Sequence, residues 1–380
     1  MLALGARLVE RGHEVVFETW KRWRGYAEGA GMRFLAAPEY PVFPTPERPV
    51  KPYEAVLLAA PRTRRALAET EPHAVLHDIL TLAPALAGEL EGLPVATLVP
   101  HVYPVAAPGL PPYALGARLP RTAWGRGLWR ALARPLRIGV ERGRAELNET
   151  RMRLGLEPLM RPHGGISAEL ALVATFPQLE YPRAWPPHAR VIGPLLWEPP
   201  YHDVAPPPGE DPLVLVAPST AQDPDHRLLR AALSGLGGER VRVLATTNRR
   251  PLGAAVDVPA NARLVEWVSY SRTMPACDLV LTHAGHGTLV RALACGCPVL
   301  AVPHAGDMAE NAARAAWARV GVRLPWRLLS PATLRLAVRH ALSEPGLGAR
   351  AAELAAWAAA NDGATRAAEL VEELALSRAR

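Results

Sequence analysis

Apolar residues along this chain recur in segments of strand length and helix length that alternate from one end to the other. The first part of the pattern predicts these elements in chain order: helix 2–10, strand 14–17, helix 53–69, strand 74–77, helix 83–91, strand 95–99, strand 170–175 and strand 190–192. The second part predicts strands 213–217, 241–245, 263–266, 279–281 and 299–302, with helices between them. Because strands that alternate with helices build parallel sheets, the pattern predicts an α/β protein.

Two proline-rich stretches interrupt this periodicity. One is a predicted loop over 38–52, and the other is the stretch 197–209. Proline at this density stiffens a linker and forbids a strand, so we expect a domain boundary at the second stretch. A chain of 380 residues also exceeds the size at which a single core keeps growing. We therefore predict a first domain over 1–198, a linker over 199–210 and a second domain over 211–360.

The composition, with 49% hydrophobic and 21% charged residues, is typical of a soluble globular protein. No segment of about 18 or more apolar residues is present, and the first residues lack the features of a secretory signal. The cytoplasm is therefore the expected location. The three cysteines, Cys277, Cys295 and Cys297, are too few for a disulfide framework and lack the second pair that a zinc site needs.

The net charge of +7 is carried almost wholly by arginine. Charge alone does not indicate nucleic-acid binding, and no helix-turn-helix, zinc or aromatic-basic module is visible, so no nucleic-acid partner is expected. Residues 118–153 combine arginine with leucine and tryptophan at helical spacing. This amphipathic stretch fits a membrane surface, but it also fits a helical lid over an acceptor cleft, which is the interpretation we favour.

The segment 279–308 carries the clearest chemical signal. An apolar run leads into Thr-His-Ala-Gly-His-Gly-Thr over 282–288, a helix-length stretch follows over 289–295, and a second apolar run begins at Pro298. A strand, a turn of small residues and a helix place backbone N–H groups at the carboxyl end of a parallel sheet, where they can hold a phosphate. The spacing does not fit the dinucleotide-binding fingerprint, which would place G-x-G-x-x-G early in the chain, whereas this segment lies near the carboxyl end. It does not fit the P-loop either, because no lysine follows the last glycine.

This segment resembles the donor-binding signature of the nucleotide-sugar-dependent glycosyltransferases related to macrolide and plant natural-product enzymes. The resemblance extends to residues 265–268 and 274–279 upstream and to 311–314 downstream. It implies the GT-B fold, in which two Rossmann-like domains face a cleft, and a last helix, here within 361–380, that crosses back to the first domain. It also implies a nucleotide sugar and a small hydrophobic acceptor as ligands, with no cofactor and no metal.

The resemblance assigns the phosphate contacts to the turn after residue 282. His283 would donate its imidazole N–H to the α-phosphate, while the backbone N–H groups of Gly287 and Thr288 approach from the start of the helix. Gly285 and Gly287 would permit close approach of the backbone. In the alternative interpretation, His283 satisfies a neighbouring loop carbonyl and Thr288 caps the helix.

Other donor contacts are implied at the ends of two earlier strands. Trp267, followed by Val268, lies where the family places an aromatic ring against the nucleobase, although a tryptophan of the core would fit the pattern too. Ser219 and Thr220 match the loop where a short hydroxyl reaches the β-phosphate, but most relatives have glycine at the position of Ser219.

The sugar and ribose positions depart from the family pattern. Asp307 occupies the position that binds sugar hydroxyls, yet it also stands three residues before Glu310, as in a capping box that starts a helix. Met308 replaces the glutamine that usually follows the aspartate. Arg291 stands where many relatives have a glutamate that binds the ribose hydroxyls, and residues 269–270 replace the common Pro-Gln. The class of donor is thus better defined than its identity.

Inverting transfer to a hydroxyl needs a general base, usually a histidine stabilised by a carboxylate. Asp78 matches that carboxylate, with capping of the following helix as its alternative role. The resemblance places the partner histidine on a Gly-His loop between the first strand and the first helix. Because the chain starts at Met1 inside that helix, we expect the first domain to lack its first strand. His13 comes too late to substitute, and His77 and His101 are expected to be structural.

The leading hypothesis is an inverting glycosyltransferase that moves a hexose or deoxyhexose from a UDP-sugar or dTDP-sugar to a hydroxyl of a small hydrophobic acceptor. His283, the amides of Gly287 and Thr288, and the hydroxyl of Thr220 would stabilise the charge on the departing diphosphate. The missing base motivates an alternative, a nucleotide-sugar-binding auxiliary or degenerate member without turnover. A sugar-nucleotide epimerase is a third hypothesis, but the sequence does not place the acidic residues that it needs around the sugar.

Overall fold

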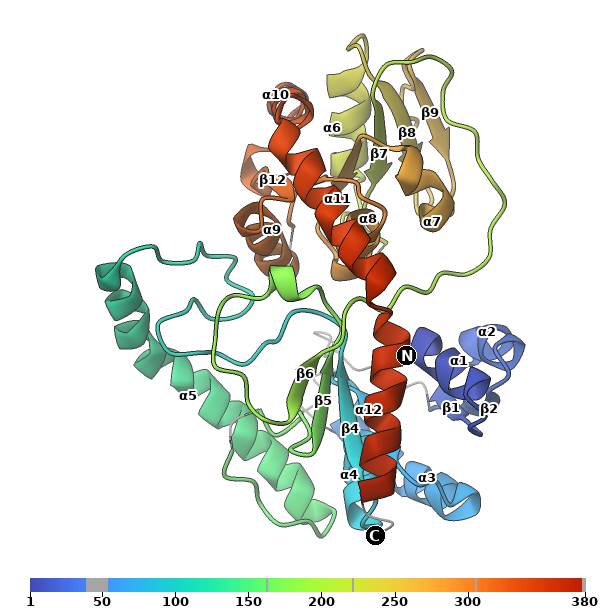
Figure 1. Ribbon diagram of the computed structural model, residues 1–380, viewed down its shortest axis with the longest axis vertical. Coiled ribbons are helices and arrows are strands. Elements are labelled where there is room, and N and C mark those ends of the chain that lie inside the picture. Colours follow the sequence, from blue (N-terminus) through green and yellow to red (C-terminus); the bar gives the residue numbers. More distant parts are fainter. Residues whose placement is uncertain (39–53, 162, 221, 305, 378–380) are drawn as a thin grey trace.

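The computed structural model describes residues 1–38, 54–161, 163–220, 222–304 and 306–377, arranged as two α/β halves (Figure 1). The predicted loop 38–52 lies almost wholly outside the described residues. The first half contains α1 (Leu2–Glu10), β1 (Val16–Thr19), α2 (Arg24–Gly29), β2 (Arg33–Ala36), α3 (Glu54–Thr70), β3 (Val75–Asp78), α4 (Ala83–Leu90), β4 (Val95–Val99), α5 (Ala123–Arg153), β5 (Leu170–Val173) and β6 (Ala189–Val191).

The second half follows the linker. It contains β7 (Leu213–Ala217), α6 (Arg227–Leu236), β8 (Arg242–Thr246), β9 (Ala262–Val265), α7 (Tyr270–Thr273), β10 (Leu279–Thr282), α8 (His286–Ala294), β11 (Val299–Ala301), α9 (Met308–Trp317), β12 (Gly321–Arg323), α10 (Pro331–Ser343), α11 (Pro345–Ala360) and α12 (Gly363–Ser377). Short 3-10 turns occur at Lys21–Trp23, Pro177–Leu179, Met274–Ala276 and Trp326–Leu328. No helix in the described ranges is long and apolar enough to cross a membrane.

The strands of the first half form two separate parallel sheets. One has the order β3-β4-β5-β6, and the other is the pair β1-β2. Strands β4 and β5 are buried along their whole length, as expected for apolar runs that are covered on both faces. Among the described strands, β1 pairs only with β2, and β3 pairs only with β4. The absence of a first strand from this domain stays a prediction.

The second half has one parallel sheet with the strand order β12-β11-β10-β7-β8-β9. The chain runs outward from β7 to β9, then returns to place β10 on the other side of β7 and continues outward to β12. The order therefore reverses between β7 and β10. In open α/β sheets, ligands bind at the carboxyl ends of the strands at such a reversal.

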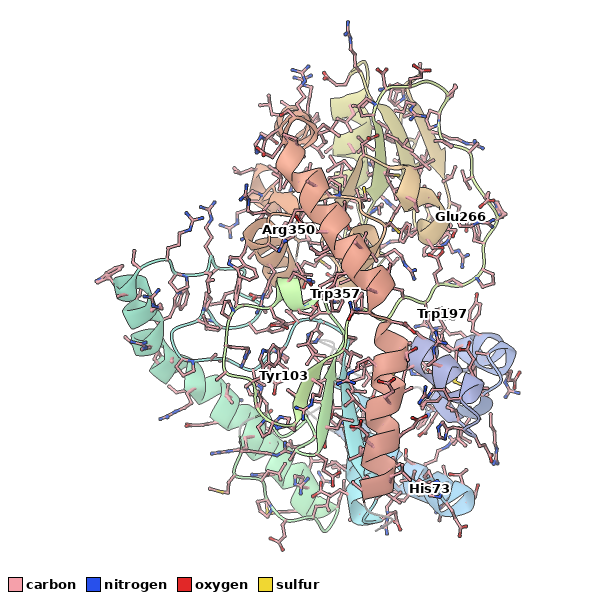
Figure 2. The ribbon with its side chains drawn as sticks, in the orientation of Figure 1. His73, Tyr103, Trp197, Glu266, Arg350 and Trp357 are labelled. Atoms are coloured by element: carbon pink, nitrogen blue, oxygen red, sulfur yellow. The ribbon has the colours of Figure 1, made fainter. Side chains whose placement is uncertain are left out.

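The end of the chain returns to the first half. Ala367 and Ala368 of α12 share a buried cluster with Leu4 of α1 and with residues of β4 and β5. Trp357, near the end of α11, packs against Phe176 with the ring centroids 5.8 Å apart, and Figure 2 places it at the boundary between the halves. The final helix thus covers the first sheet and connects the two halves a second time.

Every strand predicted from the apolar pattern is present within two residues of its expected bounds. Strands β2 and β12, of four and three residues, were not predicted. Gly321 lets β12 approach β11, since a Cβ at this position would collide with Val299. The helix predicted over 289–295 begins earlier in the structure, at His286. The sequence pattern missed this first turn because its residues are weak helix formers that carry no apolar periodicity.

Candidate active site

The candidate residues of the second half lie along one edge of its sheet, because each follows the carboxyl end of a different parallel strand. Trp267 follows β9, Ser219 and Thr220 follow β7, His283 follows β10, and Asp307 follows β11. Neighbouring strands are about 4.8 Å apart, so the row spans roughly 19 Å from β9 to β11. The loops after β7 and β10 are adjacent at the point where the strand order reverses.

The turn from β10 into α8 exposes backbone donors. Gly285 is the N-cap, and the side chains provide no capping hydrogen bond there. The N–H groups of His286, Gly287 and Thr288 therefore belong to the first turn and have no acceptor within the helix. Thr288 lies inside this turn, so its alternative role as the capping residue is wrong. A Cβ on Gly287 would meet only open space, which leaves its backbone accessible to a ligand.

His283 is oriented by its neighbours on two sides. Its ring makes a hydrogen bond with the backbone of Ala217, the last residue of β7, and burial lowers the pKa of His283. The imidazole is therefore neutral at neutral pH, with its single N–H available to the Ala217 carbonyl. A Cβ on Gly285 would collide with Nε2 of His283, so glycine is required beside the ring. The loop-carbonyl contact considered as an alternative role is thus present, and the Nε2 edge of the ring lies against the start of α8.

Ala284, between these two residues, adopts a left-handed conformation with φ of 66° and is fully buried. A non-glycine residue in this region stores local strain that the surrounding structure must offset. The side-chain amide of Asn311 donates to the Ala284 carbonyl oxygen at 3.0 Å and so holds the turn in place.

Trp267 is half-buried and lies in a group of flat side chains rather than in the core. Its ring stacks on Tyr270 with centroids 5.8 Å apart, and the Arg249 guanidinium lies 4.9 Å from its centroid. The side chain of Val268 is fully buried, so only its backbone can contribute to a site. Arg249 was not predicted from the sequence; its position just after β8 is the signal that could have indicated it.

The two hydroxyls after β7 have different surroundings. Ser219 is 5% exposed, and its Oγ accepts a hydrogen bond from the Gln222 backbone N–H at 2.8 Å. Thr220 is exposed. The structure thus uses Ser219 to close the turn and presents Thr220 to the carboxyl edge.

Asp307 precedes α9 at the N-cap position without making a side-chain cap. Its Oδ2 accepts from Asn311 Nδ2 at 3.0 Å, while Glu310 pairs with Nε of Arg314 at 2.8 Å. The capping box considered as an alternative is therefore wrong, because Glu310 is drawn into a buried ion pair. The half-buried Asp307 carboxylate remains beside the site.

The positions that depart from the family pattern meet at one carboxylate that the sequence did not indicate. Glu198, from the end of the first half, accepts hydrogen bonds from the Ser269 hydroxyl at 2.6 Å and the Tyr270 N–H at 3.1 Å. Burial would raise the pKa of Glu198, but hydrogen bonds from Ser269 and Ser271 and the charge of Arg291 hold it below its ordinary value. The arginine at 291 and the serine at 269 are thus matched to Glu198.

His286 joins the start of α8 to the first half. Its Nε2 lies 3.2 Å from the carbonyl oxygen of Ala174, just after β5, and its Nδ1 lies 3.4 Å from Oδ1 of Asn311. Burial lowers the pKa of His286 to about 4, and the nearby His101 acts in the same direction. The sequence pattern alone indicates no role for His286, because its partner Ala174 lies in the other half of the molecule.

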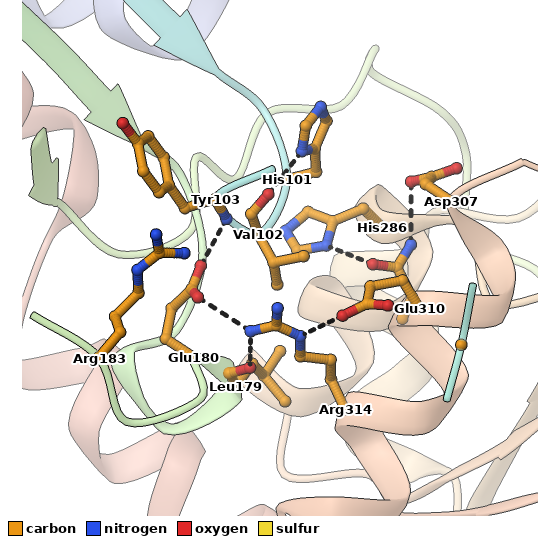
Figure 3. A network of polar contacts seen from close by, with 12 residues as sticks. His101, Val102, Tyr103, Leu179, Glu180, Arg183, His286, Asp307, Glu310 and Arg314 are labelled. Carbon is orange, nitrogen blue, oxygen red and sulfur yellow. Dashed lines mark hydrogen bonds and ion pairs between the residues drawn. The ribbon is translucent and has the colours of Figure 1, made fainter. Parts of the chain in front are cut away.

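A buried ion-pair network lies next to this contact. Arg314 of α9 donates to Glu180 at 2.9 Å and to the Leu179 carbonyl oxygen at 3.1 Å (Figure 3). Glu180 in turn accepts from the Tyr103 backbone N–H at 2.6 Å. Residues of both halves therefore form this network. The network fixes the carboxyl edge of the second sheet relative to the first sheet.

Asp78 ends β3 in the first half. Its Oδ1 accepts from the Leu80 N–H at 2.9 Å, whereas α4 starts at Ala83 with Leu82 as its N-cap, so the helix-capping alternative is wrong. The Asp78 charge acts on the amino group of Met1, although burial has the larger effect and lowers the pKa of that amine. Asp78 therefore lies beside the start of α1.

His77, His101 and His13 of the first half each have a polar partner within the protein. His77 is buried, with Nε2 2.6 Å from the Thr97 hydroxyl and Nδ1 2.9 Å from the Asp78 carbonyl oxygen. His101 places Nδ1 2.7 Å from the Val102 carbonyl oxygen, and His13 pairs with Glu372 at 2.8 Å.

Two Rossmann-like halves with a row of polar groups at their junction define the class of two-domain GT-B glycosyltransferases. The fold matches the glycosyltransferase of kitacinnamycin with a TM-score of 0.74 and 22% identity, over 98% of this chain and 94% of that one. It also matches the glycosyltransferase VinC in complex with dTDP, with a TM-score of 0.70 and 19% identity, over 99% and 95% of the two chains.

The sequence places the chain within this class. Residues 228–374 match the family model described as the C-terminal domain of erythromycin biosynthesis protein CIII-like proteins. The chain is 30% identical to 4'-demethylrebeccamycin synthase of Lentzea aerocolonigenes, over 98% of this chain and 96% of that protein. The protein therefore belongs to the macrolide and antibiotic glycosyltransferases and is itself a glycosyltransferase.

Proposed function

We propose that this glycosyltransferase binds a nucleoside diphosphate sugar along the carboxyl edge of its second sheet. One observation carries the proposal: the order of groups along that edge corresponds to the order of the parts of such a donor. The Trp267 ring lies at β9, the Thr220 hydroxyl and His283 lie at the central strands, and Asp307 lies at β11. Nucleobase, diphosphate and sugar would occupy these three places in turn.

The central strands offer the chemistry that a diphosphate requires. The unpaired N–H groups at Gly287 and Thr288 carry the positive end of the α8 dipole, and Thr220 adds a hydroxyl donor. The exposed backbone at Gly287 allows a phosphate oxygen to approach closely. His283, beside the Gly285 backbone, would donate a further hydrogen bond.

In the proposed reaction, the oxygen of an acceptor hydroxyl forms a bond to the anomeric carbon from the face opposite the diphosphate. The bond from that carbon to the diphosphate oxygen breaks, the nucleoside diphosphate leaves with the electron pair, and the configuration inverts. The acceptor proton passes to a general base, and Asp78 would stabilise the protonated base. Asp78 lies beside the start of α1. The family resemblance implies that the base stands next to it, on the loop that precedes this helix.

The donor is proposed to carry a hexose or deoxyhexose on UDP or dTDP. An aromatic platform such as Trp267 accepts uracil and thymine alike, since stacking discriminates little between them. The VinC complex with dTDP supports a pyrimidine nucleotide. The acceptor is proposed to be a small hydrophobic molecule with a free hydroxyl, held between the two halves.

Isothermal titration with UDP and dTDP tests the proposal. We expect at least one of them to bind, and we expect His283→Ala to weaken it by about tenfold or more, the value of one charge-assisted hydrogen bond. His340→Ala is the matched control, because His340 is exposed on α10. Equal affinities of the two variants for the nucleotide would show that His283 does not contribute to the donor site.

A second measurement separates transfer from binding. Release of the nucleoside diphosphate is followed with a sugar-loaded donor and a panel of polyketide and aromatic hydroxyl acceptors. We expect acceptor-dependent release, and we expect Asp78→Asn to slow it without changing the dissociation constant for the nucleotide. Nucleotide binding without release under all acceptors would favour an auxiliary, non-catalytic role.

A further inference from the structure

The amino-terminal half of α5 presents apolar side chains to solvent. Trp124 is 79% exposed, Leu128 44% and Leu132 39%. Their spacing of four residues puts them in one row along the helix, and Ile138, 67% exposed, lies on the same side at about 40° around the axis from Trp124. Figure 1 shows α5 running along the outer side of the first half, with this end projecting from the body.

A basic row lies on the same part of the helix. At about 100° per residue, Arg126, Arg130 and Arg137 fall roughly 200–240° around the axis from Trp124, on the other side of the exposed surface. Within the described part of the chain, Arg126 and Arg130 have no carboxylate within 4.0 Å, while Arg137 pairs with Glu141 at 3.0 Å. The stretch 118–140 contains six arginines and no aspartate or glutamate.

The carboxyl-terminal half of the same helix is packed in the ordinary way. Leu147 is buried with Leu82 and Leu86 of the first half, and the buried Arg151 pairs with Glu89 at 2.6 Å. This half attaches α5 firmly to the body. The apolar row and the basic row at the amino-terminal end of α5 are therefore held in a fixed position, while their side chains remain exposed to solvent.

The sequence alone favoured a helical lid for residues 118–153, but the apolar side chains in the amino-terminal half of α5 face solvent. We propose instead that this half of α5 docks on an anionic lipid surface. The apolar row of Trp124, Leu128, Leu132 and Ile138 would enter the boundary between headgroups and acyl chains. The arginines, on the opposite side of the helix, would face the lipid phosphates at the level of the headgroups. A helix that lies in the interface plane characteristically combines arginine on one face with tryptophan and leucine on the other.

Charge decides between this occupant and another protein. A second copy of this chain would bring another helix end with the same excess of arginine close to the first, and the like charges would repel each other. An apolar protein partner would leave this positive charge uncompensated, whereas lipid phosphates neutralise it. Docking through α5 would place the enzyme where hydrophobic molecules accumulate, and it does not depend on the proposed donor site.

Co-sedimentation with vesicles tests the proposal. We expect the protein to pellet with vesicles of phosphatidylcholine mixed with phosphatidylglycerol, more weakly as salt is added, and not with phosphatidylcholine alone. The triple variant W124S/L128S/L132S and the double variant R126Q/R130Q should each bind at least about tenfold more weakly. Matched controls in the second half are Leu336→Ser, at a position 62% exposed, and R240Q/R319Q, at exposed positions. These controls should bind as the unmodified protein does.

Thermal unfolding and dTDP titration check that each variant is folded. R126Q/R130Q changes only exposed side chains, so it remains informative if the triple variant is unstable. Equal pelleting with both kinds of vesicle, no pelleting at all, or equal losses in the control variants would overturn the proposal. A dimer in light scattering that the triple variant abolishes, without vesicle binding, would show that this surface binds a second copy instead.

Discussion

His286, the first residue of α8, places Nε2 3.2 Å from the carbonyl oxygen of Ala174, so the helix that starts at the proposed phosphate site touches the first sheet directly. His286 lies between Gly285 and Gly287, within the segment that the family resemblance assigns to donor binding. The motif residues on either side of it would hold the diphosphate, while its own side chain fixes the two halves against each other. The first turn of α8 would therefore both bind the diphosphate and hold the two halves of the protein in position.

The first prediction concerns stability against pH. An unfolded histidine has a pKa of about 6.5, whereas burial lowers that of His286 to about 4. Since the unfolded chain binds the proton more readily, the contribution of neutral His286 to the free energy of unfolding is complete above about pH 6.5. This contribution is lost as the pH falls towards 4. The loss is at most about 1.4 kcal/mol per pH unit, or roughly 3 kcal/mol over the whole window.

Thermal unfolding between pH 7.5 and pH 5 measures this effect. His286→Gln should lower the melting temperature at pH 7.5 but reduce its decline on acidification. Buried His77 and His283 shift in the same direction and remain in both proteins, so the difference isolates residue 286. His340→Gln is the control; a decline in His286→Gln as steep as in that control would contradict the assignment.

The second prediction concerns the buried network at the junction. Replacing Arg314 with methionine leaves the Glu180 and Glu310 carboxylates buried without their cation, which costs about 3–5 kcal/mol. The triple variant R314M/E180Q/E310Q should recover a substantial part of this loss, because neutral amides are cheaper to bury. Chemical denaturation measures both. Equal stability of the single and triple variants would show that charge burial is not the cause.

The third prediction concerns proton uptake on nucleotide binding. A neutral His283 has one N–H, which the Ala217 carbonyl can occupy, so a hydrogen bond from the ring to phosphate requires the second nitrogen to be protonated. The affinity for dTDP should then rise as the pH falls from 8 to 6.5, by up to about tenfold per pH unit.

Titration in two buffers with different ionisation enthalpies counts the protons taken up. His283→Gln, which keeps an amide donor but cannot titrate, should bind more weakly with no proton uptake. If the variant and the unmodified protein show the same pH dependence, His283 does not donate to the phosphates in the way described.

The fourth prediction compares two glycines of the phosphate turn. Gly285→Ala places a methyl group against Nε2 of His283, so it should destabilise the protein by about 1–3 kcal/mol and also weaken dTDP binding. Gly287→Ala meets open space in the free protein and lies within a helix, so stability should be unchanged or rise by up to about 1 kcal/mol. Its methyl group would nevertheless stand where the phosphate approaches, and affinity should fall.

Thermal shift with and without dTDP distinguishes the two. A Gly287→Ala variant that is as stable as the unmodified protein and binds dTDP equally well would show that the start of α8 is not the phosphate site. Gly127→Ala, at an open position of α5, controls for the general effect of replacing glycine in a helix.

Apolar alternation alone determined most elements of the fold. The strands beginning at Leu213 and Val95 match their expected bounds because each is a short apolar run that is buried on both faces of its sheet. Local periodicity depends only on residues that are close together along the chain, so it can be detected without knowledge of the tertiary structure. The short strand at Gly321 carried no such signal, since the close approach to Val299 that stabilises it joins segments far apart in the chain.

The candidate site divides in the same way. The motif from His283 to Thr288 is local, and the sequence alone located it at the end of a strand. The strand order that sets Trp267, Thr220, His283 and Asp307 in a row, and the contacts of His286 and Glu198 across the halves, exist only after distant segments pack together. Sequence determined which groups could bind a phosphate; tertiary structure decided their neighbours, because hydrogen bonds and ion pairs depend on distances in space and not along the chain.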